Sequence, residues 1–245
     1  MTSLLCTIKL QKSIKDLIKN RASFCFLEKK MPIASLATTW DRGDVVSKDL
    51  QVIAIGKSGY GKSTTLNALI GEPAFETNDT QGCTRTMQSA EYSFPTCDEN
   101  FNFSLADLPG IGENPELDKG YIDLYRVAIN KSHVVIYFLK ADQRDYSIDE
   151  WAFSRLFQAS EDKRKVILVL NAIDKVEPLS RRRPFVLSAE QQLNIDIKIS
   201  NICKAFGVAQ INTVSISALE NINTDVLVNR IRDLLVPYMQ SYRSS

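Results

Sequence analysis

The chain has almost no net charge, one histidine, five scattered cysteines and no long apolar run. A formal net charge of +1 gives no overall basis for binding nucleic acid. The odd number of cysteines and the lack of a CxxC pair argue against a zinc or redox centre and favour a reducing compartment. No apolar stretch approaches the roughly 18 residues that span a bilayer, and the first residues lack a signal-peptide core. We therefore expect a cytoplasmic protein that is at most peripherally bound to a membrane.

The length and the apolar content favour a folded α/β protein. A chain of 245 residues accommodates one sizeable domain and an extension, and 44% apolar residues is ordinary for a soluble core. This composition argues against a disordered or fibrous protein. We expect residues 1–46 to form an N-terminal extension and linker, and residues 47–245 to form the main domain.

Positive charge is concentrated in the extension. Residues 1–31 hold seven basic and two acidic residues, a net of 7 − 2 = +5. Within residues 8–25 the apolar side chains share one helical face and the lysines lie largely elsewhere, which predicts a basic amphipathic helix. Such a helix most often packs on its own domain. The alternatives are contact with an anionic membrane surface or with ribosomal RNA.

From residue 50 onward, apolar runs alternate with helical patterns. Nearly continuous apolar runs are typical of strands covered on both faces, and we expect central strands at 51–55, 101–106, 133–139, 165–170 and 211–216. The alternating run 90–94 is expected to be an edge strand paired with 101–106. Helices are expected at 62–70, 120–131, 148–158, 188–205 and 222–240. This order predicts a doubly wound α/β fold with a mostly parallel six-stranded sheet.

A glycine-rich loop follows the first expected strand and precedes the first expected helix. Gly56 to Ser63 match GxxxxGK[ST], in which backbone N–H groups and the helix N-terminus bind phosphates. Lys62 is expected to bridge the β- and γ-phosphates, and Ser63 to ligate Mg²⁺. Tyr60 either shields the nucleotide or is an exposed loop residue. The candidate binding residues are Gly56, Ser58, Gly59, Tyr60, Gly61, Lys62, Ser63 and Thr64.

A second motif, DLPG, ends the strand 101–106. Asp107 can hold Mg²⁺, and the N–H of Gly110 can donate to the γ-phosphate. Between the two motifs lies the polar segment 78–88, which is long enough to fold over a nucleotide. We expect Thr84 to bind Mg²⁺ and the γ-phosphate, with Thr80 and Thr86 as alternatives.

The sequence NAIDK, residues 171–175, follows the expected strand 165–170. Asp174 can accept hydrogen bonds from the N1–H and 2-amino groups of guanine, a pair of donors that adenine lacks. Asn171 either reaches the purine N7 or ties this loop to the phosphate loop. Ser217 and Ala218 end the last expected strand, where their backbone could approach the base O6. Because a wrong base leaves a buried acid unpaired, this set predicts selectivity for guanine.

These motifs, in this order, resemble those of the Ras-like GTPases over roughly residues 50–240. In detail they are similar to the Era/TrmE-like branch and to predicted prophage-associated GTPases of the YeeP/YfjP type, through DLPGIGEN, LKADQRDYSIDEW and NAIDKVEP. The phosphate loop also resembles those of AIG1-like and immunity-related GTPases. The resemblance implies a three-layer P-loop NTPase fold, GTP and GDP as ligands, Mg²⁺ as cofactor, and Lys62, Thr84 and Gly110 as the catalytic groups.

The chain departs from the family pattern at three positions. Ala172 stands where the family has a lysine whose stem lies along the base, so affinity is expected to fall unless Lys175 partly compensates. Ile111 stands where Ras-type enzymes have a water-orienting glutamine, which predicts slow turnover. Gly59 stands where potassium-activated members have an asparagine, so potassium stimulation is not expected.

The sequence therefore predicts a slow, Mg²⁺-dependent GTPase that acts as a nucleotide-state switch or assembly GTPase. The alternatives are a nucleotide-loaded interaction module without turnover and an ATP-binding P-loop protein. A homodimer across the nucleotide face could supply what Ile111 lacks, and Arg85 or Arg144 is a candidate arginine finger. We expect a structural role for His133 and a solvated loop at residues 181–183.

Overall fold

The computed structural model describes residues 48–77, 87–95, 100–110, 115–179 and 185–241. The predicted extension, residues 1–46 with its basic helix, lies outside these ranges. So do Arg85, Ile111, the candidate threonines at 80, 84 and 86, and the arginines at 181–183.

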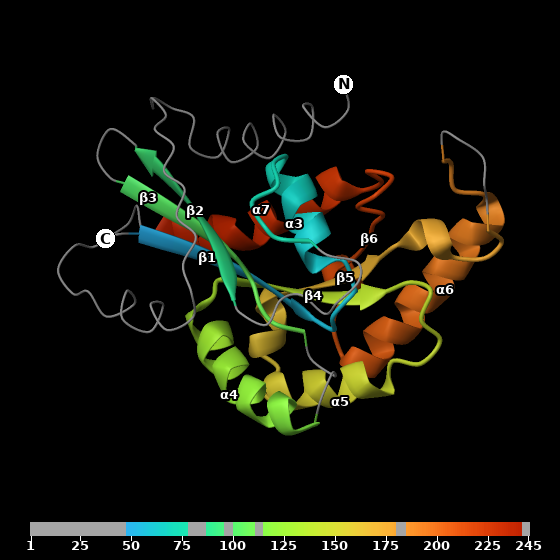
Figure 1. Cartoon of the computed structure of the whole chain (residues 1–245), viewed down its shortest axis with the longest axis horizontal. Coiled ribbons are helices and arrows are strands. Elements are labelled where there is room, and N and C mark those ends of the chain that lie inside the picture. The colour runs from blue at the N-terminus through green and yellow to red at the C-terminus, as the bar shows by residue number, and fades with distance from the viewer. Residues whose placement is uncertain (1–47, 78–86, 96–99, 111–114, 180–184, 242–245) are drawn as a thin grey trace.

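One six-stranded sheet forms the centre of the domain (Figure 1). Its order is β2-β3-β1-β4-β5-β6, and every neighbouring pair is parallel except β2 and β3. The mostly parallel sheet and the antiparallel edge strand are thus confirmed. The strands are β1 (Lys48–Gly56), β2 (Gln88–Pro95), β3 (Asn100–Asp107), β4 (Val134–Lys140), β5 (Val166–Asn171) and β6 (Thr213–Ser215).

Helices cover both faces of the sheet and complete three layers. Figure 1 shows α3 (Lys62–Ile70) and α7 (Thr224–Ser241) on one face. The other face carries α4 (Pro115–Lys131), α5 (Ser147–Leu156) and α6 (Ala189–Phe206). This two-sided cover explains why the apolar runs of β4 and β5 are nearly continuous, since Val134–Leu139 and Val166–Asn171 are buried throughout.

Two predicted boundaries were wrong. The run 211–216 is a strand only over Thr213–Ser215, because Gln210–Asn212 form a 3₁₀ turn, η3, that leads into β6. Helix α4 begins at Pro115, five residues before the predicted start. Proline is favoured in the first helical turn, where its missing N–H has no intrahelical partner to lose.

The register places four loops at the same edge of the sheet. Gly56 of β1 pairs with Phe138 of β4, and Ala54 pairs with Asp107 at the end of β3. Further along, Lys140 pairs with Asn171 at the end of β5. Because parallel strands end at the same edge, the chain segments that follow β1, β3, β5 and β6 meet there.

The described helices include none that is both long and apolar enough to cross a bilayer.

Candidate functional site

The loop between β1 and α3 has the backbone that its glycines allow. Gly56, Gly59 and Gly61 have φ values of 142°, 72° and 80°, a region that favours glycine. A Cβ at Gly56 would lie 2.6 Å from the carbonyl oxygen of Phe138, whereas a Cβ at Gly59 would meet no atom within 4 Å. Ser58 and Thr64 are half-buried, and Gly59 is exposed. The loop therefore needs glycine for close packing at its start and for conformation at its tip.

Lys62 points back into this loop. Its side chain is 5% exposed, and Nζ donates to the carbonyl oxygens of Gly56 and Lys57, each at 3.2 Å. A buried ammonium inside a glycine-rich loop supplies a positive charge that suits an anion. The structure thus brings the predicted phosphate-binding groups of residues 56–63 together.

Asp107 lies beside the start of α3 and is fully buried. Its Oδ2 accepts a short hydrogen bond from the Ser63 hydroxyl. Burial raises the pKa of the Asp107 carboxyl, while the Lys62 charge and the Ser63 hydroxyl lower it. Among the described residues, the other carboxylate oxygen, Oδ1, has no hydrogen-bond partner.

This pair fits Mg²⁺. A buried carboxylate with an unpartnered oxygen, next to a serine hydroxyl, supplies the hard oxygen ligands that the ion prefers. Within the described ranges there is no group of three or more His, Cys, Asp or Glu side chains that could hold a metal alone. A site with one or two protein ligands is typical of Mg²⁺ bound together with substrate phosphates.

The DLPG turn lies against the phosphate loop. A Cβ at Gly110 would be 2.5 Å from the backbone nitrogen of Ser58, so only glycine fits at this approach. The Tyr125 hydroxyl of α4 donates to the carbonyl oxygen of Pro109, and the N–H of Leu108 donates to Ala54. These contacts fix the turn next to the site.

Asn171 ties three loops together. Its Nδ2 donates to the carbonyl oxygen of Tyr60 at 2.9 Å, and its Oδ1 accepts from the N–H of Ala218 at 3.3 Å. Of the two roles expected for Asn171, the structure shows the tie to the phosphate loop. The residue after it, Ala172, has a φ of 62° and directly precedes η2 (Ile173–Lys175), the 3₁₀ turn that carries Asp174.

The side chain of Asp174 is held by the side-chain hydroxyl of Ser217. The Ser217 hydroxyl donates to Oδ1 of Asp174 at 2.6 Å and accepts from the N–H of Glu220 at 3.2 Å. The Ser217 N–H donates to the carbonyl oxygen of Ile222 and the Ala218 N–H donates to Asn171, so the expected approach of their backbone to the base O6 stays a prediction. The N–H of Ser217 is therefore engaged in the antiparallel bridge between Ser217 and Ile222. A serine directly after a strand end was the available signal for the hydroxyl contact.

Tyr60 is not the exposed loop residue that one alternative proposed. It is 4% exposed, and its hydroxyl donates to Asp149 of α5 at 3.1 Å. Lys57 forms an ion pair with the same carboxylate at 2.9 Å. Sequence reasoning gave Asp149 no role, although it lies within LKADQRDYSIDEW, because its contact with Tyr60 spans 89 residues.

Two other candidates lie away from these contacts. Lys175 is exposed at the end of η2, and its compensating role stays a prediction. The Arg144 side chain is 91% exposed and lies 4.0 Å from Glu177, an ordinary surface pair.

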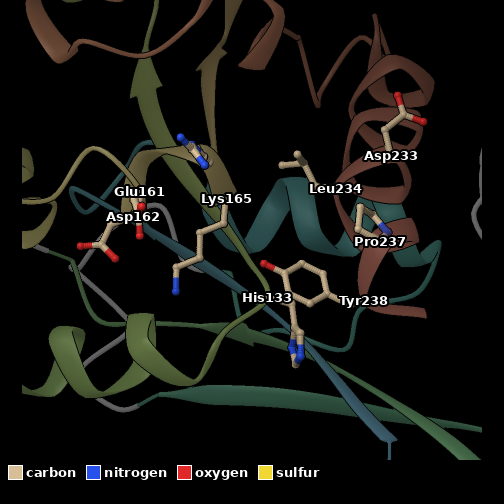
Figure 2. Close-up of a pocket in the computed structure, with 9 residues that line it drawn as sticks. His133, Glu161, Asp162, Lys165, Asp233, Leu234, Pro237 and Tyr238 are labelled. Atoms are coloured by element: carbon tan, nitrogen blue, oxygen red, sulfur yellow. The ribbon is translucent and has the colours of Figure 1, made fainter. Parts of the chain in front are cut away.

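His133, Lys165 and Tyr238 are among the residues that line a depression of about 480 Å³ (Figure 2). Since His133 and Lys165 directly precede β4 and β5, the depression lies at the amino ends of these strands. The Nδ1 of His133 accepts from the N–H of Gln51 at 3.0 Å, and the Tyr238 ring packs edge-on against the imidazole. Lys165 donates to the carbonyl oxygens of Ile129 and Ser132. These groups are engaged in structural contacts, as expected for His133.

The fold and the edge geometry define a class of protein. A glycine-rich loop joins β1 of the mostly parallel sheet to α3. The buried Lys62 and the Ser63–Asp107 pair lie at the carboxyl edge of this sheet. This arrangement is that of a P-loop nucleotide-binding protein.

Comparison with known proteins narrows the class. The family described as "50S ribosome-binding GTPase" matches residues 51–172. The chain is 33% identical over 152 residues to the uncharacterized protein YfjP of Escherichia coli, covering 62% of this chain and 50% of that protein. It is 28% identical over 186 residues to GTPase Era of Geotalea daltonii, covering 75% and 54%. The chain thus belongs to the P-loop GTPases, and it spans about half the length of these curated relatives.

Solved structures share the fold. Era of Aquifex aeolicus, bound to GDP·AlF4⁻, has a TM-score of 0.55 and 24% identity, covering 75% of this chain and 56% of that chain. Toc33 of Arabidopsis thaliana, in a dimerization-deficient mutant, has a TM-score of 0.58 and 17% identity, covering 96% and 92%. Era has also been solved with MgGDPNP and part of 16S ribosomal RNA, at a TM-score of 0.54 and 24% identity over 76% of this chain and 56% of that chain.

Proposed function

We propose that this chain is a Mg²⁺-dependent GTPase that binds GTP and GDP, hydrolyses GTP slowly and acts as a nucleotide-state switch. One observation carries the proposal. Asp174 is fixed by the Ser217 hydroxyl in a loop that Asn171 ties to the phosphate loop, so an acid suited to guanine lies at the phosphate-binding edge.

The phosphate end would use both backbone and side chains. The N–H groups of residues 56–63 and the ammonium of Lys62 would bind the β- and γ-phosphates, with Gly110 donating to the γ-phosphate. Ser63 and Asp107 would hold Mg²⁺, together with Thr84. Bound there, Mg²⁺ would neutralise charge on the phosphates.

The base end would select guanine through Asp174. Its two carboxylate oxygens, one of them held by Ser217, would accept the N1–H and the 2-amino group. Adenine lacks this donor pair and would leave the acid unpaired, which costs roughly 10⁴-fold in affinity at sites of this kind. The proposal of slow turnover rests on Ile111, because an apolar side chain cannot orient a water.

Calorimetric titration tests the guanine site. Nucleotide-free protein in Mg²⁺ is titrated with GDP, a slowly hydrolysed GTP analogue and ADP, and the Asp174→Asn variant is compared with wild type. We expect binding of both guanine nucleotides, little binding of ADP, and a loss of guanine preference in the variant. Equal or absent binding of GDP and ADP by wild type would contradict a guanine-specific site.

A nucleotide-loaded interaction module without turnover is the second candidate. Ile111 and Ala172 favour it, because the first removes a water-orienting group and the second removes a lysine stem from the base. Single-turnover hydrolysis with excess protein separates the two functions. Phosphate release above the buffer control supports the GTPase, and none, with or without a partner, supports the module.

A homodimer across the nucleotide face would give each site groups from a second copy. In the chloroplast translocon components atToc33 and psToc159, which share this fold, dimerization is important for the GTPase activity. Light scattering with GDP and with the GTP analogue tests this arrangement. A mass that doubles only with the analogue supports a nucleotide-linked dimer, and a constant monomer mass argues against it.

The basic segment 1–31 is a candidate RNA or membrane contact. Its local charge of 7 − 2 = +5 supports an anionic partner. Because the Era neighbour was solved with ribosomal RNA, RNA binding is the first measurement. Deleting residues 1–46 should abolish such binding while GDP binding remains.

A further inference from the structure

Asp149 connects α5 to the phosphate loop, although it belongs to none of the four loops at the nucleotide edge. It lies in the first turn of α5 and is 1% exposed. Its Oδ2 is 2.9 Å from Nζ of Lys57 and accepts from the Tyr60 hydroxyl at 3.1 Å. Its backbone oxygen accepts from the Tyr137 hydroxyl of β4 at 3.1 Å. One carboxylate thus holds two side chains of the phosphate loop against a fixed helix.

Stability alone does not explain a charge at this position. Burial raises the pKa of the Asp149 carboxyl, and the Lys57 and Tyr60 contacts only oppose that effect. In the described part of the chain, its Oδ1 has no hydrogen-bond partner. Buried ion pairs are often no more stabilising than apolar residues of the same volume, so the charge calls for another reason.

The phosphate loop supplies that reason. Three of its residues are glycines with positive φ, and a glycine-rich backbone loses much conformational freedom when it orders around phosphates. Lys57 and Tyr60 stand on either side of Gly59, so clamping both restrains the tip of the loop. The Tyr60 carbonyl is also held by Asn171. A loop restrained in this way needs less ordering when a ligand binds.

Resting on the proposed nucleotide function, we propose that Asp149 is a positioning residue that holds the phosphate loop, through Lys57 and Tyr60, in the shape that accepts a β-phosphate. Helix α5 is then part of the phosphate-binding apparatus, although it contacts no ligand. The effect depends on the phosphates of the ligand. The affinity for GDP, which has a β-phosphate, depends on Asp149, whereas the affinity for GMP does not.

The test compares Asp149→Asn with wild type in the full chain. GDP affinity is measured by calorimetry in Mg²⁺ and GMP affinity by ligand-observed NMR. We expect GDP binding to weaken about tenfold or more while GMP binding stays within about twofold, so the GDP-to-GMP ratio falls. The exposed neighbour Glu150→Gln is the matched control and should leave both affinities unchanged. Tyr60→Phe, which removes only one hydroxyl, should lower the GDP-to-GMP ratio by a smaller factor. This variant replaces Asp149→Asn in the test if Asp149→Asn does not fold.

A triple variant separates positioning from stability. Lys57→Met, Tyr60→Phe and Asp149→Leu together remove both charges and the hydroxyl that Asp149 accepts from, and they keep the site filled, so the urea unfolding midpoint should return close to that of wild type. We expect the GDP-to-GMP ratio to stay low. A ratio that recovers with the midpoint, or an equal loss of GDP and GMP binding in Asp149→Asn, overturns the positioning role. A wild type that binds no GDP refutes the proposed function instead.

Discussion

At the scale of single residues, Ala172 has an unusual backbone for a residue with a side chain. Its φ of 62° lies in the left-handed region, which costs an L-residue about 1–2 kcal/mol. It stands directly between Asn171, which ties the loops, and the turn that carries Asp174. The backbone strain is therefore placed next to the proposed base-reading acid.

Ala172→Gly should stabilise the fold. Glycine adopts this φ freely, and after its larger unfolded-state entropy is subtracted we expect a gain of about 0.5–1 kcal/mol in the free energy of unfolding. Urea titration of the variant measures this gain. The matched control, Ala205→Gly on the exposed side of the last turn of α6, should instead lose up to about 1 kcal/mol. A loss of stability in Ala172→Gly would show that the left-handed backbone costs nothing here.

Ala172→Lys should tighten GDP binding, because the stem of a lysine at this position would cover the base. The preference for GDP over ADP should stay the same, since Asp174, the proposed guanine-binding acid, is unchanged. Ala172→Met supplies an apolar stem without charge and should give part of the gain. Calorimetry on the three proteins decides the point, and equal GDP affinities would mean that Ala172 is not the cause of any weakness.

His133 should resist protonation. Its Nδ1 accepts a backbone hydrogen bond and it is partly buried, so burial and the Lys165 charge lower its pKa below 6.5. A lowered folded-state pKa means that the stabilising contribution of neutral His133 is present above about pH 6.5 and is lost as the pH falls through the folded-state pKa. Since the chain has one histidine, its NMR titration in untagged protein is unambiguous. A midpoint above 6.5 would contradict this prediction.

At the scale of elements, local patterns predicted most of what the structure shows. The glycine loop and its following helix were located to the residue, since α3 spans 62–70. The contacts that the sequence did not reveal are long-range. Asp149 meets Tyr60 across 89 residues, and Ser217 meets Asp174 across 43 residues. No periodicity or spacing encodes such pairs, because they depend on how α5 packs against the sheet and on the pairing of β6 with β5.

The phosphate loop should tolerate change at one glycine and not at another. Gly59→Asn should fold with a nearly unchanged melting temperature, because its Cβ meets open space and asparagine tolerates positive φ. Gly56→Ala should destabilise the fold by about 2 kcal/mol or more, because its Cβ would collide with the Phe138 carbonyl. Thermal unfolding of both variants tests the contrast, and similar losses in the two would refute it.

At the scale of the whole molecule, nucleotide binding should raise the stability of the folded protein. With GDP and Mg²⁺ at about 100 times the dissociation constant, binding adds about 2.7 kcal/mol, which raises the melting temperature of a domain of this size by about 5–10 °C. ADP at the same concentration should leave it unchanged. A chelator added with GDP should remove part of the rise, because Asp107 and Ser63 would lose the ion. An equal rise with ADP would contradict guanine selectivity.

The position of β1 in the sheet also has a consequence while the ribosome is making the chain. This strand is made first, yet it lies at the centre of the sheet between β3 and β4. At about 5–20 residues per second, the ribosome needs about 4–17 s to add the 140 − 56 = 84 residues from Gly56 to Lys140. During that interval Val52–Ile55, which are buried in the native sheet, have no β4 partner and are suited to chaperone binding. A nascent chain stalled before Ser217 would therefore carry its phosphate loop without the serine that holds Asp174, the proposed guanine-binding acid.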